Sequence, residues 1–241
     1  MNIFEIKKTK YISHRGFTPL APENSLPSFY YAGLFGQWAI ETDFHTTKDG
    51  EVVCCHDEKI DNYCTEKGKI SDMTYSEILK CPIINGNRID CFSIEERRIP
   101  KLSEYLGICR RFGSIPFIEL KEDDVEYVIH CLHKYGFSDK EFVASSGSLA
   151  RLKECRRISK DIFVHWIFAK EDRLSELASL GNAGLSFNIP NAFDCSEEKI
   201  KSVHDMGLKV CLRAADRLES FDYMKKLSLD YFPTNTMHDK I

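Results

Sequence analysis

Short apolar runs alternate with stretches of helical periodicity along most of the chain. The runs are rich in β-branched and aromatic residues and have the length of buried strands. They read KYISH, WAIETDF, SIPFIELK, KEFVASS, DIFVHWIF, AGLSFNI, LKVCLRA and LDYFPTN. Amphipathic segments lie between most of them, for instance DDVEYVIHCLHKYG, which Gly136 closes. Alternation of this kind predicts a parallel sheet, and about eight repeats close a (β/α)8 TIM barrel.

Residues 51–100 break this alternation. They carry EVVCCHD, a turn-rich NYCTEKGKIS, a short helical MTYSEILK and the loop INGNRIDCFSIEERRIP. We interpret this stretch as a small insertion between the second and third barrel strands. No internal repeat, low-complexity stretch or linker is evident, so residues 1–241 are predicted to form a single domain.

Composition and charge narrow the possible partners. A length of 241 residues is normal for one α/β barrel, and a net charge of -4 gives no general attraction to nucleic acid or anionic membrane. Lysines near the N-terminus interrupt the apolar stretch that a secretory signal needs, and no run has the length of a membrane span. We therefore expect a cytoplasmic protein without stable membrane insertion. The ten cysteines lie in apolar runs with no C-x-x-C pair, which favours buried free thiols. The sequence leaves the oligomeric state open.

Ionisable residues follow three of the predicted strands at the point where each strand ends. His14 and Arg15 follow the first strand, Glu41 and Asp43 end the second, and Glu119 and Lys121 end the third. In an α/β barrel the carboxyl ends of the strands and the loops after them form the active site. We therefore expect these side chains to meet at one end of the barrel.

The types of these residues point to metal-assisted chemistry on a phosphoryl group. Three clustered carboxylates raise one another's pKa unless a cation neutralises them, and hard oxygen ligands favour Mg²⁺ or Ca²⁺. The predicted metal ligands are Glu41, Asp43 and Glu119. His14 and His56 remain as general acid and base, because imidazole titrates near working pH. Arg15 and Lys121 suit a phosphoryl group.

Several motifs in order resemble those of the glycerophosphodiester phosphodiesterase family. They occur in SHRGFTPLAPENS, IETDFHTTKDGEVVCCHD, RIPKL and FIELK. The family pattern is H-R-G, E-N-[ST], E-x-D, T-x-D-G and H-D, with E-L-K downstream. The close match covers roughly residues 11–121, and beyond it only the strand-helix rhythm and a terminal PTN agree.

The resemblance implies a metal-dependent barrel that hydrolyses small glycerophosphodiesters to glycerol 3-phosphate and an alcohol. It implies His14 and His56 as catalytic histidines, a phosphate contact for Arg15, and metal binding by Glu41, Asp43 and Glu119. It also implies a loop pair, Glu23 and Asn24, at the site. An alternative is that Glu23 and Asn24 only begin the first helix, since Asn is a good N-cap.

The chain departs from the family pattern near its end. CLRAAD, with Arg213, stands where the family usually has a Trp near the seventh strand, and TNTMH lacks a usual Pro. Arg213 either favours a more anionic substrate or forms an ion pair with Asp216. Two other functions stay open: a lyase of the phospholipase D type, which stops at a cyclic phosphate, and a non-catalytic barrel that binds a phosphodiester.

Overall fold

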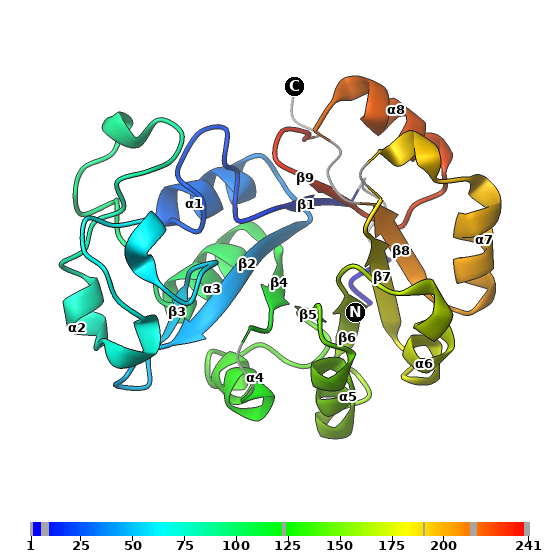
Figure 1. Cartoon of the computed structure of the whole chain (residues 1–241), viewed down its shortest axis with the longest axis horizontal. Helices are drawn as coiled ribbons and strands as arrows, with labels where there is room; N and C mark the ends of the chain where they lie inside the picture. The colour runs from blue at the N-terminus through cyan, green and yellow to red at the C-terminus, as the bar shows by residue number, and fades with distance from the viewer. Residues whose placement is uncertain (1, 6–9, 122–123, 190, 213–215, 239–241) are drawn as a thin grey trace. The chain divides into compact units, whose positions relative to one another are not determined.

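The computed structural model describes residues 2–5, 10–121, 124–189, 191–212 and 216–238 (Figure 1). The chain divides into two compact units, Met1–Ile12 with Asp123–Met237 and Ser13–Glu122 with His238–Ile241. Strands lie within all eight of the predicted runs, and helices separate them along the chain. The predicted strand-helix alternation is therefore confirmed, while the single domain stays a prediction.

The second unit is built on the paired strands β2 (Ala39–Thr46) and β4 (Ile115–Glu119). They run parallel, and their register places Asp43 opposite Glu119. Helices α1 (Leu26–Leu34) and α3 (Leu102–Phe112) pack against each other beside them. The fully buried Tyr105 of α3 donates its hydroxyl to the carbonyl of Ile40 at 2.6 Å and accepts the Phe117 amide at 3.1 Å. This one side chain fixes α3 to both strands.

The insertion lies between β2 and β4, as predicted (Figure 1). It begins with β3 (Val52–Cys54), which pairs antiparallel with β2. Short pieces follow: η1 (Ile60–Asn62), η2 (Ile70–Asp72), α2 (Tyr75–Ile78) and η3 (Ile89–Cys91). They surround a small core of their own, which consists of Val53, Cys55, Ile60, Cys64, Ile70, Tyr75, Ile78, Cys81, Ile83 and Ile99. We call the part of the insertion that follows β3, residues 55–100, the excursion. Its residues pack together with Val53 of β3 in this buried cluster, so the excursion is an ordered part of the second unit.

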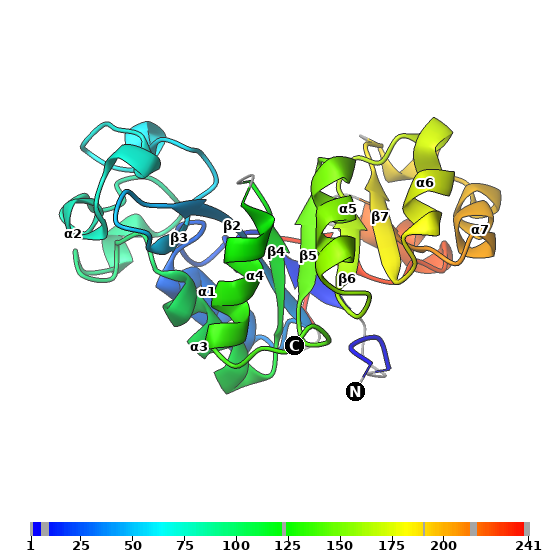
Figure 2. The ribbon, with the colours of Figure 1, turned by 90° about the horizontal axis from the view of Figure 1, so that it is seen from below.

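The first unit continues the alternation. Its strands are β5 (Val143–Ser146), β6 (Phe163–Trp166), β7 (Ala183–Phe187), β8 (Lys209–Leu212) and β9 (Phe232–Thr234). Neighbouring strands from β5 to β8 pair in parallel. The helical segments are α4 (Val125–Lys134), α5 (Leu149–Ile158), η4 (Glu171–Arg173), α6 (Leu174–Ser179), η5 (Ala192–Asp194), α7 (Glu197–Asp205) and α8 (Leu218–Lys226). Helix α5 packs along β5 and β6 (Figure 2). Strand β1 (Tyr11–Ser13) joins the two units in sequence.

Two predictions from composition concern the whole chain. Every cysteine except Cys91 is buried, which confirms their predicted place in apolar surroundings. Within the described ranges, no helix combines the length and the apolar character that crossing a membrane requires.

Candidate active site

Three carboxylates from two neighbouring strands meet in the second unit. Glu41 and Asp43 lie on the same face of β2, because side chains alternate along a strand, and Glu119 ends β4 opposite Asp43. One carboxylate oxygen from each of the three lies within 4.8 Å of the other two. Glu41 and Asp43 are buried, at 6% and 1% exposure. The structure thus brings together the predicted metal ligands.

The electrostatics of this cluster favour a bound cation. Burial raises the pKa of Glu41 well above its ordinary value, and the nearby carboxylates of Asp43 and Glu119 raise it further. Burial and then Asp43 also raise the pKa of Glu119, although Lys121 lowers it. Glu41 and Glu119 therefore hold their protons more tightly than exposed carboxyl groups do, because burial and neighbouring negative charge both disfavour the ionised form.

Lys121 supplies part of that charge. Its Nζ lies 3.1 Å from Asp43 Oδ1 and 2.8 Å from Glu119 Oε1. Burial acts to lower the pKa of Lys121, but the two carboxylates outweigh burial and raise it. The structure thus places Lys121 against carboxylates.

The turn after β1 carries His14 and Arg15. His14 is half-buried and comes directly after the strand. Arg15 and Gly16 both have positive φ, 57° and 83°, so the chain reverses sharply here. The reversal points the Arg15 amide at Glu41 Oε2, to which it donates at 2.8 Å. The backbone of this turn is thereby tied to the carboxylate cluster.

The Arg15 guanidinium is held by carboxylates on two sides. Nη1 lies 3.0 Å and 3.1 Å from the two oxygens of Glu23, and Nε lies 3.6 Å from Asp43 Oδ2. Burial acts to lower the pKa of Arg15, but Glu23 and then Asp43 outweigh it and raise the pKa. Arg15 is therefore a fixed positive charge at the edge of the cluster, and Glu23 contacts it directly.

Asn24 is part of the cluster and not a helix cap. The N-cap of α1 is Ser25, which forms a capping box with Ser28. Asn24 instead donates from Nδ2 to Asp43 Oδ2 at 3.2 Å and accepts from the Thr42 hydroxyl at 2.7 Å. The interpretation of Asn24 as a helix cap is thus wrong, because its side chain turns inward to the buried carboxylate.

His56 reaches the site from the antiparallel strand β3. The amide of the residue before it, Cys55, donates to the carbonyl of Asp43 at 3.1 Å. The His56 Nδ1 lies 2.7 Å from Asp57 Oδ1. An Nδ1 proton shared with that carboxylate leaves Nε2 as the ring nitrogen that can exchange protons with a ligand. The Nε2 atom of His45 lies 3.2 Å from the backbone carbonyl of His56.

A pocket of about 570 Å³ opens beside His56. Its lining includes His45, His56, Asp57, Asn62 and Lys121. The candidate acid or base and the lysine on the carboxylate cluster thus line one space. Arg213 lies outside the described residues.

Sequence reasoning missed two residues near the site. Tyr63 donates its hydroxyl to Glu23 Oε1 at 2.8 Å, and Asn62 donates from Nδ2 to Asp57 Oδ2 at 3.0 Å. Both lie in the turn-rich NYCTEKGKIS, which has no apolar periodicity and no recognisable motif. No sequence feature indicated which of its polar residues face the site.

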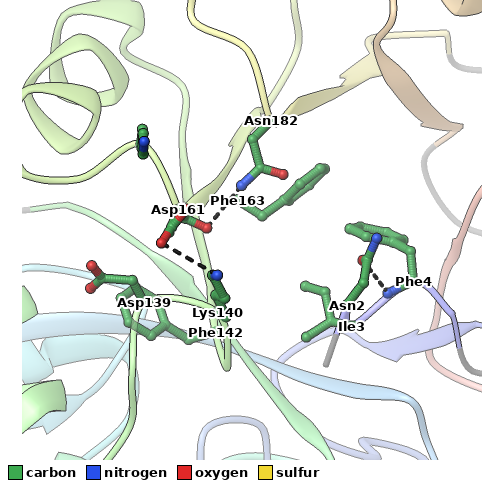
Figure 3. Close-up of a pocket in the computed structure, with 10 residues that line it drawn as sticks. Asn2, Ile3, Phe4, Asp139, Lys140, Phe142, Asp161, Phe163 and Asn182 are labelled. Atoms are coloured by element: carbon green, nitrogen blue, oxygen red, sulfur yellow. Dashed lines mark hydrogen bonds and ion pairs between the residues drawn. The ribbon is translucent and has the colours of Figure 1, made fainter.

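A second pocket, of about 370 Å³, lies in the first unit (Figure 3). It is at the amino ends of the strands, since Phe142 precedes β5 and Asn182 precedes β7. Lys140 pairs with Asp161 across it at 3.5 Å. Barrel enzymes place their chemistry at the opposite ends of the strands, so this pocket is the weaker candidate.

Comparisons with known proteins agree with the geometry. The model of the glycerophosphoryl diester phosphodiesterase family matches residues 14–238. A protein of Caldanaerobacter subterraneus called glycerophosphodiester phosphodiesterase is 27% identical over 232 residues, which is 92% of each chain. A Bacillus altitudinis protein of the same name is 33% identical over 153 residues, 59% of this chain and 60% of that protein.

Solved structures extend the likeness to the fold. An Oleispira antarctica phosphodiesterase in complex with the product sn-glycerol-3-phosphate has a TM-score of 0.84 at 20% identity, over 98% of this chain and 96% of that one. A putative glycerophosphoryl diester phosphodiesterase from Silicibacter pomeroyi has a TM-score of 0.77 at 23% identity, over 94% and 90%. The predicted (β/α)8 TIM barrel is thereby confirmed.

Proposed function

The chain belongs to the glycerophosphoryl diester phosphodiesterase family, and we propose that it hydrolyses glycerophosphodiesters to glycerol 3-phosphate and an alcohol with a divalent cation and two histidines. It is an enzyme of the phosphoric diester hydrolase class. The observation that carries the mechanistic proposal is the meeting of three carboxylate oxygens within 4.8 Å, beside a fixed arginine. A cytoplasmic location stays a prediction.

The residues of the cluster fit a divalent cation. Among the residues that the structure describes, four carboxylates, those of Glu23, Glu41, Asp43 and Glu119, lie beside two paired cationic side chains, Arg15 and Lys121. The cluster therefore lacks about two positive charges when every carboxyl group is ionised. Glu41, Asp43 and Glu119 would hold Mg²⁺ or Ca²⁺ through oxygen ligands, which both ions prefer. The bound ion would supply Lewis-acid stabilisation of negative charge on the phosphoryl oxygens.

The protein's own groups supply orientation and proton transfer. Arg15, fixed by Glu23, offers its guanidinium to the phosphodiester. One of His14 and His56 takes the proton from the attacking oxygen as that oxygen bonds to phosphorus. The other gives a proton to the alcohol oxygen as its bond to phosphorus breaks. The attacking oxygen comes from water, or from a glycerol hydroxyl whose cyclic phosphate water then opens.

A panel of substrates and cations tests this function. Glycerophosphodiesters of choline, ethanolamine, glycerol and inositol are incubated with the purified protein and Mg²⁺ or Ca²⁺, and released glycerol 3-phosphate is measured. We expect release from at least one substrate, and a loss of at least about a hundredfold in Glu41→Gln, since removing one charged ligand disrupts the cation site. Glu126→Gln, on the exposed side of α4, is the matched control and keeps full activity.

Two results would contradict the proposal. Absence of glycerol 3-phosphate with every substrate and both cations would remove the hydrolase assignment. Turnover in Glu41→Gln equal to that of the control would remove the metal assignment.

A further inference from the structure

One short turn of the excursion reaches two groups of the active site through separate hydrogen bonds. We propose that residues 60–63 form a positioning device, in which Tyr63 fixes Arg15 through Glu23 and Asn62 fixes His56 through Asp57. The inference rests on the proposed function, because it assigns Arg15 to the phosphodiester and His56 to proton transfer. It adds two positioning residues, Tyr63 and Asn62, which act through Glu23 and Asp57.

The first arm runs from Tyr63 to Arg15. The Tyr63 hydroxyl donates to Glu23 Oε1 at 2.8 Å, and both Glu23 oxygens accept from Arg15 Nη1. Burial, together with the Glu23 carboxylate, raises the pKa of Tyr63, so its hydroxyl stays a donor at every working pH. Without the Tyr63 hydroxyl, the Glu23 carboxylate loses a hydrogen bond that limits its rotation. The guanidinium then loses a fixed partner.

The second arm runs from Asn62 to His56. Asn62 Nδ2 donates to Asp57 Oδ2 at 3.0 Å, while Asp57 Oδ1 lies 2.7 Å from His56 Nδ1. Burial acts to raise the pKa of Asp57, but the bonds from Asn62 and His56 outweigh it and lower the pKa. The carboxylate therefore stays ionised and turned toward the ring. Asn62 thus sets the orientation of the imidazole through Asp57, although it lies six positions from His56 in the sequence.

The turn itself is firmly anchored. Ile60 is fully buried in the excursion core, and its carbonyl accepts the amides of Tyr63 and Cys64, each at 2.9 Å. The carbonyl of Tyr63 accepts the Ile84 amide at 2.7 Å, and that of Asn62 accepts the Asn85 side chain at 2.7 Å. Neighbouring residues on one rigid support therefore hold groups with different tasks, and the two arms are separable by mutation.

Tyr63→Phe tests the first arm. The variant keeps the ring and removes only the bond to Glu23, and we expect the dissociation constant of glycerol 3-phosphate, measured by calorimetry, to rise roughly tenfold. In a Glu23→Ala background, which has no oxygen to accept from the Tyr63 hydroxyl, the same change has no further effect. Tyr75→Phe is the matched control, since its hydroxyl bonds to the Ile99 carbonyl and to Arg98, both within the excursion, and it leaves the constant unchanged.

Asn62→Ala tests the second arm. We expect kcat for a glycerophosphodiester to fall roughly tenfold while the dissociation constant of glycerol 3-phosphate stays within about twofold, because the phosphate contact is intact. In an Asp57→Ala background, which has no oxygen to accept from the Asn62 amide, the further loss disappears. Asn87→Ala, whose side chain donates to the Thr18 carbonyl, is the control and keeps full kcat.

Nitrogen NMR measures the effect of each variant on Arg15 and His56 in the absence of substrate. We expect the side-chain N–H signals of Arg15 to broaden in Tyr63→Phe, and the Nδ1–H form of His56 to lose population in Asn62→Ala. Equal effects of Tyr63→Phe and Tyr75→Phe on binding and on the NMR spectrum would overturn the first arm. An unchanged His56 spectrum in Asn62→Ala would overturn the second arm. If the variants show these NMR changes while the wild-type protein hydrolyses no glycerophosphodiester, the proposed function is contradicted and the positioning is left intact.

Discussion

Glu41 shows at a single residue how the site opposes folding when no cation is bound. Burial and two neighbouring carboxylates raise its pKa, so the folded protein binds a proton there more tightly than the unfolded chain does. Ionising Glu41 at neutral pH therefore lowers the stability of the metal-free protein. The same crowding of carboxylates provides the ligands of the proposed metal site.

Metal-free Glu41→Gln is expected to be more stable than the wild type at pH 7, by about 1 kcal/mol in the free energy of unfolding. Gln has no charge to bury and can still accept the Arg15 amide. The folded pKa lies above the unfolded value, so wild-type stability is lost as pH rises from the unfolded pKa toward the folded one. The difference therefore shrinks below about pH 4, near the unfolded pKa. Urea unfolding with a chelator at both pH values measures it.

The order reverses when the cation is added. Saturating Mg²⁺ or Ca²⁺, at about a hundred times its dissociation constant, stabilises the wild type by about 2.7 kcal/mol and leaves Glu41→Gln nearly unchanged. If Glu41→Gln is less stable than the wild type at pH 7 without any cation, the claim that the ionised Glu41 destabilises the metal-free protein is wrong.

The sequence predicted the ionisable residues at strand ends but not what holds them. Glu41, Asp43 and Glu119 stand out because charge is rare on a buried strand. Tyr63 does not, since its bond to Glu23 spans 40 positions of the sequence. The motif resemblance indicated Asn24, but not its bond to Asp43, which spans 19 positions. Such pairings depend on how the turns fold, and local patterns carry little information on that.

At the scale of elements, the turn between β1 and α1 depends on close packing around Gly16. Gly16 has a φ of 83°, and a Cβ atom there would lie 2.8 Å from the backbone carbonyl carbon of Ser28. Ser28 belongs to the capping box of α1, and its hydroxyl also donates to the Arg15 carbonyl at 3.2 Å. The turn that carries His14 and Arg15 is therefore seated directly on the start of the helix.

Gly16→Ala is expected to destabilise the protein by about 3 kcal/mol or more, through strained φ and a backbone clash. The matched control is Gly107→Ala in the middle of α3, where a Cβ atom would meet nothing within 4 Å. Helix propensity makes that change neutral or stabilising, by up to about 1 kcal/mol. Denaturant unfolding measures the free energy of unfolding of both variants. Equal values would contradict the claim that the backbone around Gly16 leaves no room for a Cβ atom.

The predictability of the elements follows their packing. The predicted barrel strands are short runs rich in apolar residues because parallel strands are buried on both faces, and the structure has a strand in each of the eight runs. The excursion was recognised only as an interruption. Its 3-10 turns are three residues long, too short for a periodic pattern, and they depend on a buried cluster assembled from dispersed residues such as Ile60 and Ile83.

For the whole molecule, the alternation of strands and helices was sufficient to predict the TIM barrel. The ordered series of motifs added the family, which the match over residues 14–238 confirms. These motifs are readable because the chemistry needs particular residue types directly after particular strands. No comparable sequence pattern indicates which alcohol is released, and Arg213, where the sequence departs from the family pattern, lies outside the described residues.

The nature of the product tests the central claim most directly. Phosphorus NMR of the purified protein with glycerophosphocholine, glycerophosphoethanolamine, glycerophosphoglycerol or glycerophosphoinositol follows each phosphorus species over time. We predict that with Mg²⁺ or Ca²⁺ at least one substrate is converted to glycerol 3-phosphate as the final product, and that a chelator stops the conversion. Accumulation of a cyclic phosphate without glycerol 3-phosphate, or equal conversion in the presence of the chelator, would contradict metal-dependent hydrolysis.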